Sequence, residues 1–361
     1  LDSIVDRIAA NLSVLGVSKG DRVAIILANC PEFINLVLAV VRIGAIAVPL
    51  NVREQAPELA YILNDCSAQV LIYDVKVASR LPSKESITSV EHRFSVGGVV
   101  AGSRSVEDLL GESAATLPDV EANEEDVAII LYTSGTTGRP KGAMITHFNI
   151  VHSVMHFEMC MGLTTKDRSL LAVPASHVTG LIANVLTTVR VAGCSLILPE
   201  FNPVAFLELA ARERMTYTLM VPAMYNLCLL RADFADYDLT SWQIGGYGGA
   251  PMPERTIAAL ATKLPNLQLM NAYGSTEVTS PATIMPAGET SRQTDSVGWT
   301  VPCGDIQIVN SDGHPVAAGD VGEIWIAGPM VVPGYWNDPE RTSDAFSDGY
   351  WKSGDIGSMD H

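Results

Sequence analysis

The sequence is poor in positive charge and in long apolar runs, and each shortage excludes a class of protein. Its 23 lysines and arginines face 40 aspartates and glutamates, which leaves a formal net charge of −17. Because a nucleic-acid backbone is bound by a basic surface, this balance argues against nucleic acid as a partner. The longest largely apolar stretch, residues 33–41, ends at Arg42 and is too short to cross a bilayer, so we expect no transmembrane segment.

Paired cysteines, internal repeats and low-complexity tracts are also missing. The cysteines are scattered, without a CxxC pair or the spacing of metal ligands, and this pattern is typical of free thiols in a reducing compartment. It predicts a cytoplasmic protein. The six cysteines are Cys30, Cys66, Cys160, Cys194, Cys228 and Cys303. Hydrophobic residues make up 48% of the 361 positions, so the chain can bury a large core, and we expect more than one domain.

Helical and extended patterns alternate along most of the chain. Short continuous apolar runs such as residues 23–28 are typical of strands buried on both faces, and amphipathic stretches separate them. This alternation predicts an α/β fold with parallel sheets and flanking helices. After about Pro286 two runs, 305–310 and 322–328, indicate strands around an Asp-Gly turn, and no helical pattern is evident. The predicted parts are two α/β subdomains, residues 1–165 and 166–285, and a small β-rich, barrel-like subdomain, residues 286–361.

The stretch LYTSGTTGRPKG, residues 131–142, has the composition of a phosphate-binding loop. It follows a strand-like run, residues 127–133, and ligands of open α/β sheets bind at the carboxyl ends of strands. Glycines let backbone N–H groups approach an anion and hydroxyls add donors, so the loop can hold a triphosphate even in an acidic chain. The residues that we expect to hold the phosphates are Thr133, Ser134, Gly135, Thr136, Thr137, Gly138 and Lys141.

This loop differs from the Walker A motif of P-loop NTPases. Lys141 lies six residues after Gly135, as in that motif, but Pro140 takes the place of its second glycine. Gly142 replaces the Ser or Thr that would bind magnesium, and residues 143–147 indicate extended chain rather than a helix. A plain surface turn is the alternative interpretation. The combination of strand, hydroxyl cluster, proline and lysine favours a phosphate-binding loop in a fold other than that of the P-loop NTPases.

The motif TSGTTGRPKG resembles the phosphate-loop signature of the adenylate-forming superfamily, which includes acyl-CoA synthetases, adenylation domains of peptide synthetases and luciferases. Four later motifs are similar to those of the family and come in the same order. They are GGAPMP (248–253), NAYGSTE (271–277), GEIWIAGPMVVPGYW (322–336) and YWKSGD (350–355). The resemblance spans essentially the whole chain and is greatest to an acyl-CoA ligase.

The resemblance implies a nucleotide-binding role for each motif. Tyr273 would stack on adenine, and Asp355 would hold the ribose, since a carboxylate accepts from two hydroxyls. Thr276 would contact the α-phosphate, and Glu277 would bind Mg²⁺, to which hard carboxylate oxygens are suited. Taken alone, each residue has a structural interpretation: Tyr273 as a core tyrosine, Thr276-Glu277 as the start of a helix, and Asp355 as a turn residue. The implied nucleotide-binding residues beyond the loop are Gly249, Ala250, Pro251, Asn271, Ala272, Tyr273, Gly274, Thr276 and Asp355, and the implied catalytic residues are Lys141, Thr276 and Glu277.

The same resemblance places His177, in PASHVTG, at the mouth of an acyl pocket together with Gly180, Gly246 and Gly248. A lone histidine near an apolar helix is more often a structural group, and we interpret His177 as a gate or pocket residue rather than a proton carrier. The pocket stretches contain no Arg or Lys for a second carboxylate, and PASHVTG has no acid for an amino group. A fatty or aromatic monocarboxylate is the expected substrate.

The implied reaction has two steps and uses ATP, Mg²⁺ and coenzyme A. A carboxylate oxygen attacks the α-phosphorus of ATP, which gives an acyl-adenylate and pyrophosphate, and a thiol then displaces AMP. Two alternatives stay open: a nucleotide-binding module without catalysis, and an adenylation domain that loads a carrier-protein thiol. A homo-oligomer is compatible with the sequence.

Family members carry a hinge just after the motif of Asp355, and then a mobile C-terminal lid domain with a lysine that promotes adenylation. Neither lies within the 361 residues, which end at His361. We therefore expect this stretch alone to bind ATP or AMP, to adenylate poorly and to leave thioester formation incomplete.

Overall fold

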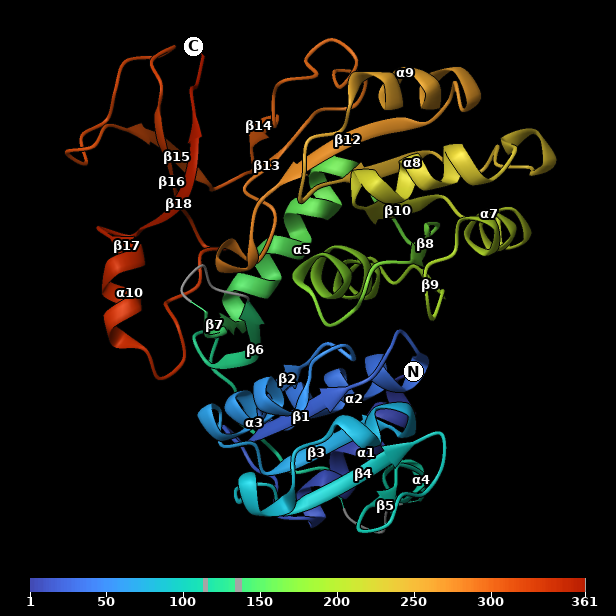
Figure 1. Ribbon diagram of the computed structural model, residues 1–361, viewed down its shortest axis with the longest axis vertical. Helices are drawn as coiled ribbons and strands as arrows, with labels where there is room; N and C mark the ends of the chain where they lie inside the picture. The colour runs from blue at the N-terminus through green and yellow to red at the C-terminus, as the bar shows by residue number, and fades with distance from the viewer. Residues whose placement is uncertain (113–115, 134–137, 361) are drawn as a thin grey trace. The chain divides into compact units, whose positions relative to one another are not determined.

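The computed structural model describes residues 1–112, 116–133 and 138–360, and Figure 1 shows the course of the chain. The chain forms two compact units. Unit 1 comprises Leu1–His147, Pro174–His177 and Tyr335–Asn337. Unit 2 comprises Phe148–Val173, Val178–Gly334 and Asp338–His361. Two short segments from later in the sequence therefore complete the N-terminal unit.

Unit 1 is built on a sheet with the strand order β5-β4-β3-β1-β2-β6-β7. The strands from β5 to β6 are parallel to their neighbours, whereas β6 and β7 are antiparallel. The strands are β1 (Arg22–Ile26), β2 (Ile46–Pro49), β3 (Val70–Asp74), β4 (His92–Val96), β5 (Arg104–Ser105), β6 (Val127–Thr133) and β7 (Lys141–Thr146). The helices are α1 (Asp2–Val14), α2 (Pro31–Arg42), α3 (Ala56–Asp65) and α4 (Glu107–Leu110), with 3-10 turns at Val75–Arg80 and Lys84–Ser86.

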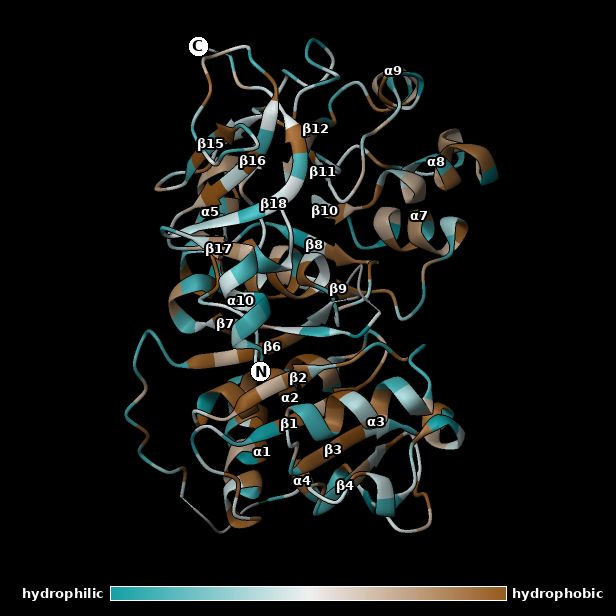
Figure 2. Cartoon of the chain, turned by 60° about the vertical axis from the view of Figure 1, so that its left-hand side comes forward, coloured by the Kyte–Doolittle hydropathy of each residue, from teal (hydrophilic) through white to brown (hydrophobic). Residues whose placement is uncertain are grey.

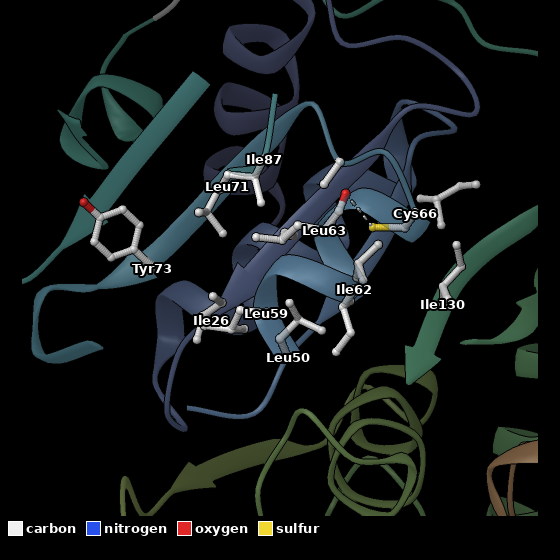
Figure 3. Close-up of a cluster of buried hydrophobic side chains, with 14 of the residues drawn as sticks. Ile26, Leu50, Leu59, Ile62, Leu63, Cys66, Leu71, Tyr73, Ile87 and Ile130 are labelled. Carbon is white, nitrogen blue, oxygen red and sulfur yellow. Dashed lines mark hydrogen bonds between the residues drawn. The ribbon is translucent and has the colours of Figure 1, made fainter. Parts of the chain in front are cut away.

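A cluster of apolar side chains fastens α3 to this sheet (Figure 3). Leu59, Ile62 and Leu63 follow the i, i+3, i+4 spacing that places side chains on one face of a helix. They pack in one buried cluster with Ile26 of β1 and Leu71 of β3. Each such side chain contributes roughly 1.5–3 kcal/mol when it is fully buried, so this face holds the helix in place.

Unit 2 contains a second sheet, with the order β14-β13-β12-β11-β10-β8-β9. The strands from β9 to β12 are parallel, and β13 and β14 continue the sheet in the antiparallel sense. The strands are β8 (Arg168–Leu171), β9 (Cys194–Ile197), β10 (Tyr217–Met220), β11 (Ile244–Tyr247), β12 (Gln268–Tyr273), β13 (Thr283–Ile284) and β14 (Trp299–Thr300). The helices are α5 (His147–Met161), a π-helix η3 (Thr179–Leu186), α6 (Thr187–Arg190), α7 (Pro203–Arg212), α8 (Pro222–Arg231) and α9 (Glu254–Lys263), with 3-10 turns at Phe234–Asp236 and η5 (Thr276–Val278).

Unit 2 also holds a small antiparallel sheet, with the order β15-β16-β18-β17. Its strands are β15 (Asp305–Val309), β16 (Gly322–Ala327), β17 (Phe346–Ser347) and β18 (Tyr350–Gly357). The expected absence of helix after Pro286 is wrong, because α10 (Pro339–Ala345) precedes β17. Asp338 caps this helix by accepting from the N–H of Arg341 at 3.0 Å, and Pro339 stands at its start. No residue of α10 is buried, and Figure 2 shows it as largely hydrophilic, so it lacks the apolar face that reveals a helix.

The predicted fold class is confirmed. Parallel sheets with helices make up most of the chain, and the predicted hairpin of residues 305–310 and 322–328 is the antiparallel pair β15–β16. The subdomain boundaries at residues 165 and 285 stay predictions. All six cysteines are free thiols. None of the helices in the described ranges combines the length and the apolarity that a membrane span needs.

Candidate functional site

The candidate phosphate loop joins β6 and β7, whose antiparallel pairing places Thr133 opposite Lys141. β6 runs beside the parallel strand β2, and its residues 128–131 are buried. Lys141 therefore begins a returning strand, where a P-loop NTPase would begin a helix. Gly138, at φ +93°, lies in the left-handed region that favours glycine. The predicted residues Ser134, Gly135, Thr136 and Thr137 lie outside the described part of the chain.

Packing explains why residue 142 is a glycine. Gly142 is buried in β7 opposite Tyr132. A Cβ on Gly142 would lie 2.8 Å from Cγ2 of Ile130 and 3.0 Å from Cζ of Tyr132. The serine or threonine that Walker A requires at this place would displace both side chains. The hairpin thus has no room for the magnesium-binding hydroxyl of that motif.

Lys141 is held by an aromatic residue from far along the chain. Its Nζ lies 3.3 Å from Oη of Tyr335 and 4.7 Å from the centroid of the tyrosine ring. Tyr335 is 3% exposed and forms an isolated β-bridge with Ala143. A cation over an aromatic face is stabilised by roughly 0.5–2 kcal/mol. The contact restricts the ammonium group to a position beside the loop.

The segment Tyr335–Asn337 is anchored in unit 1 through Asp65, at the end of α3. The backbone oxygen of Asp65 accepts from Nδ2 of Asn337 at 2.8 Å and from Nε1 of Trp336 at 3.3 Å. Its carboxylate accepts from the hydroxyl of Tyr132, and burial together with this bond raises the pKa of Tyr132. The N–H of Trp336 in turn donates to the oxygen of Gly142 at 2.7 Å. Both strands of the hairpin are therefore tied to α3.

In unit 2 the candidate adenine motif and the candidate base-stacking motif lie on neighbouring strands. β11 and β12 are parallel and hydrogen-bonded, so the residues that follow β11 lie beside the end of β12. A Cβ on Gly248 would lie 2.4 Å from the backbone oxygen of Ala272, and this close approach requires a glycine. The exposed residues of the adenine motif, Gly249, Ala250 and Pro251, follow directly.

Tyr273 and Asp355 meet although 82 positions separate them. The hydroxyl of Tyr273, at the end of β12, donates to Oδ2 of Asp355 in β18 at 2.7 Å. Burial of the ring and this hydrogen bond raise the pKa of the Tyr273 hydroxyl, so the phenol stays protonated and acts as a donor. Asp355 is exposed, and its carboxylate can accept further hydrogen bonds. The structure thus brings together the residues predicted for adenine and for ribose.

Thr276 and Glu277 open the 3-10 turn η5. Glu277 is 7% exposed, and its backbone oxygen accepts from the N–H of Val332 at 2.9 Å. Within the described ranges, no group of three or more His, Cys, Asp or Glu side chains could hold a metal ion. A single carboxylate fits Mg²⁺ where phosphate oxygens supply further ligands, which is the usual way that Mg²⁺ is bound with nucleotides.

The predicted acyl-pocket residues lie in different elements. His177 ends the turn Pro174–His177 of unit 1, whereas Gly180 lies in the π-helix η3 and Gly246 in β11, both of unit 2. A Cβ on Gly246 would lie 2.9 Å from Cγ of Leu219, so close packing of the sheet accounts for this glycine. π-Helical turns are often found at functional sites, and η3 carries the residues that follow His177.

Tyr335 and Asn51 contact candidate site residues through their side chains and were not predicted. Tyr335 holds Lys141, and its signal was present in the motif that ends in Gly-Tyr-Trp. Asn51 contacts His177, with 3.0 Å between Nδ2 and Nε2. Asn51 follows the apolar strand β2, and a polar residue at the carboxyl end of a parallel strand is a signal that could have found it.

Comparisons with known proteins agree with these motifs. A family model described as "AMP-binding enzyme" matches residues 1–336. The long-chain-fatty-acid–CoA ligase FadD13 of Mycobacterium tuberculosis is 34% identical, over 100% of this chain and 70% of its own length. A feruloyl-CoA synthase of Amycolatopsis sp is 33% identical, over 99% of this chain and 70% of its own length. The solved N-terminal domain of FACL13 from M. tuberculosis superposes with a TM-score of 0.91 at 31% identity, over 99% of this chain and 88% of that one.

Proposed function

The chain belongs to the AMP-binding enzyme family, and on this premise we propose that it activates a fatty or aromatic monocarboxylic acid with ATP and transfers it to coenzyme A. It is then an AMP-forming acid–thiol ligase. The first step forms a bond between a carboxylate oxygen and the α-phosphorus of ATP, and pyrophosphate leaves. In the second step the thiol sulfur attacks the acyl carbon, loses its proton, and AMP leaves.

The hydrogen bond between Tyr273 and Asp355 is the observation that carries the nucleotide part of the proposal. It joins two separate motifs of the family at one place in unit 2, with a ring that can stack on a base and an exposed carboxylate that can accept from ribose hydroxyls. The relatives named as long-chain fatty acid and feruloyl ligases support the substrate class.

Lys141, Thr276 and Glu277 are the proposed catalytic residues. Lys141 supplies positive charge where the pentavalent phosphorus gathers negative charge, and its contact with the Tyr335 ring restricts the positions that its ammonium group can adopt. Thr276 donates to an oxygen of the α-phosphate. Glu277 would hold a Mg²⁺ ion together with phosphate oxygens, and that ion would neutralise charge on the departing pyrophosphate. We also propose a cytoplasmic location, which the free thiols support.

Carboxylate-dependent exchange of pyrophosphate into ATP tests the first step, with the full-length protein and a panel of acids. We expect exchange with fatty or aromatic monocarboxylates, and none with amino acids or dicarboxylates. Exchange with amino acids alone would contradict the substrate class. Binding of ATP without exchange for any acid would instead support a nucleotide-binding module. Product analysis with coenzyme A and with a carrier-protein thiol then decides which thiol accepts the acyl group.

A further inference from the structure

The ring of His177 makes one defined contact within unit 1. Nε2 of His177 lies 3.0 Å from Nδ2 of Asn51, in the segment that follows β2. The other side-chain atom of the same amide, Oδ1 of Asn51, accepts from the N–H of Arg53 at 2.9 Å. The asparagine therefore bridges its own turn and a ring that lies 126 positions later in the sequence.

These two contacts decide which nitrogen of the imidazole carries the proton. A backbone N–H can only donate, so the atom of Asn51 that faces Arg53 must be the oxygen, and the NH₂ group must face His177. An NH₂ group can only donate, so Nε2 of His177 must accept. The proton of the neutral ring therefore sits on Nδ1, and a proton added at Nε2 would face the Asn51 N–H and break the hydrogen bond.

The backbone that carries His177 is held as firmly as its ring. Within the turn Pro174–His177 the N–H of His177 donates to the oxygen of Pro174 at 3.2 Å. The N–H of Ala175 donates to Oδ1 of Asn29 at 2.8 Å, and Asn29 is 4% exposed. One asparagine thus fixes the main chain of the turn and the other fixes the ring.

The surroundings of the ring favour its neutral form. The His177 residue as a whole is exposed, yet the protein that lies against its ring lowers the pKa of the imidazole. This desolvation is the cause of the shift, and no charged side chain of the described residues contributes to it. The charged residues nearest to Asn51 in sequence are Arg53 and Glu54, and Arg53 takes part through its backbone N–H.

We propose that Asn51 is a positioning residue that holds His177 neutral with its proton on Nδ1, so that His177 offers the acid substrate an uncharged hydrogen-bond donor. The role towards the substrate rests on the proposed function. The chemistry gives the reason: the carboxylate loses negative charge as it attacks phosphorus, so an imidazolium would stabilise the ground state more than the transition state. A neutral donor orients the carboxylate without that penalty.

The variant Asn51→Asp isolates this effect. An aspartate has nearly the same shape and still accepts from the N–H of Arg53, so the turn is retained, but it presents an acceptor to Nε2 instead of a donor. It should move the proton to Nε2 and raise the pKa of His177 by about 1–3 units through the opposite charge. Histidine-selective ¹⁵N NMR of the full-length protein, with His177→Gln to assign the signal, reports both quantities. A protonated Nε2 in the native protein, or an unchanged His177 titration in Asn51→Asp, would overturn the assignment.

Exchange kinetics test the consequence for the reaction. In Asn51→Asp the neutral ring carries its proton on Nε2, so Nδ1 can no longer donate to the substrate, and above the new His177 pKa the exchange rate should fall about tenfold, to that of His177→Ala. In a His177→Ala background, Asn51→Asp should cause no further change: the double variant and His177→Ala should have the same exchange rate at each pH. The same loss in the presence and in the absence of the His177 ring would show that Asn51 acts only on the fold. Exchange with no acid would refute the proposed function and the role in the reaction, while the NMR result would still decide the tautomer.

Discussion

Replacing Gly248 with alanine is expected to destabilise unit 2 and to weaken ATP binding. The new Cβ would lie 2.4 Å from the backbone oxygen of Ala272 on the neighbouring strand. Real Cβ atoms essentially never come closer than 3.0 Å to another atom, so β11 and β12 must separate by about 0.6 Å at this point. The new Cβ is bonded directly to the backbone and its contact is a backbone oxygen, so no side-chain rotation can relieve the contact.

The expected loss in the free energy of unfolding follows from this separation of the two strands. A displacement of this size stretches a neighbouring N–H···O bond to about 3.5 Å, beyond the usual range of protein hydrogen bonds. Loss of one backbone hydrogen bond costs about 1 kcal/mol, and overpacking adds about 1–3 kcal/mol. A loss of about 2–4 kcal/mol corresponds to a decrease in Tm of roughly 4–16 °C for a unit of this size.

Thermal and urea unfolding followed by circular dichroism measure this loss, and calorimetric titration measures the affinity for ATP. The matched control is Gly246→Ala in β11, the strand that Gly248 follows. Its Cβ would lie 2.9 Å from Cγ of Leu219, a longer approach than 2.4 Å and one to side-chain rather than backbone atoms, so we expect a smaller loss of about 1 kcal/mol. A Gly248→Ala protein as stable as the native one, or no less stable than Gly246→Ala, would refute the reasoning.

Three further predictions concern charge, a hydrogen bond and pH. Lys141→Met should lower the kcat of ATP–pyrophosphate exchange by about 10²–10³-fold, because it removes a cation from the developing phosphate charge, whereas the exposed Lys166→Met should change it less than about twofold. An equal decrease in kcat in both variants would mean that the loss comes from the change in net charge rather than from the position of Lys141. Tyr273→Phe removes the hydroxyl that donates to Asp355, and we expect the KM for ATP to rise about fivefold with little change in stability. An unchanged KM would show that the hydrogen bond between Tyr273 and Asp355 does not contribute to ATP binding. His156 is 2% exposed, and burial, followed by the neighbouring His152, lowers its pKa to about 4. Between pH 6.5 and 4 the unfolded chain binds a proton that the folded chain does not, so the free energy of unfolding should fall by about 3 kcal/mol as the pH decreases through this window, and His156→Gln should reduce that slope in urea unfolding. The same slope in both proteins would mean that His156 titrates normally.

The sequence predicted the elements whose signals are local. Apolar runs such as β1 are buried throughout most of their length, and the i, i+3, i+4 spacing of α3 describes the face that packs in the core. The helix α10 was not predicted because none of its residues is buried, so its sequence has no periodic apolar pattern. Its start could still have been recognised, since Asp338-Pro339-Glu340 has the composition of a capped first turn.

Contacts between distant positions were the part that local patterns could not supply. Family resemblance brought Tyr273 and Asp355 into one hypothesis, but neither residue by itself predicts a partner 82 positions away. The pairing of Lys141 with Tyr335 and that of His177 with Asn51 depend on how strands and turns are arranged in three dimensions. Gly142 could be recognised as a departure from Walker A, whereas the reason for it, contact with Ile130 and Tyr132, requires the register of β6 and β7.

The return of Tyr335–Asn337 to unit 1 has a consequence for synthesis on the ribosome. Lys141 and Tyr335 are 194 positions apart, which at about 5–20 residues per second corresponds to roughly 10–40 s of translation. During that time the hairpin of β6 and β7 exists without the tyrosine that receives its lysine and without the bonds of Trp336 and Asn337 to Asp65. The nascent N-terminal unit therefore stays incomplete until residues 148–334 of unit 2 have been synthesised, and during that time a quality-control factor could recognise the incomplete hairpin.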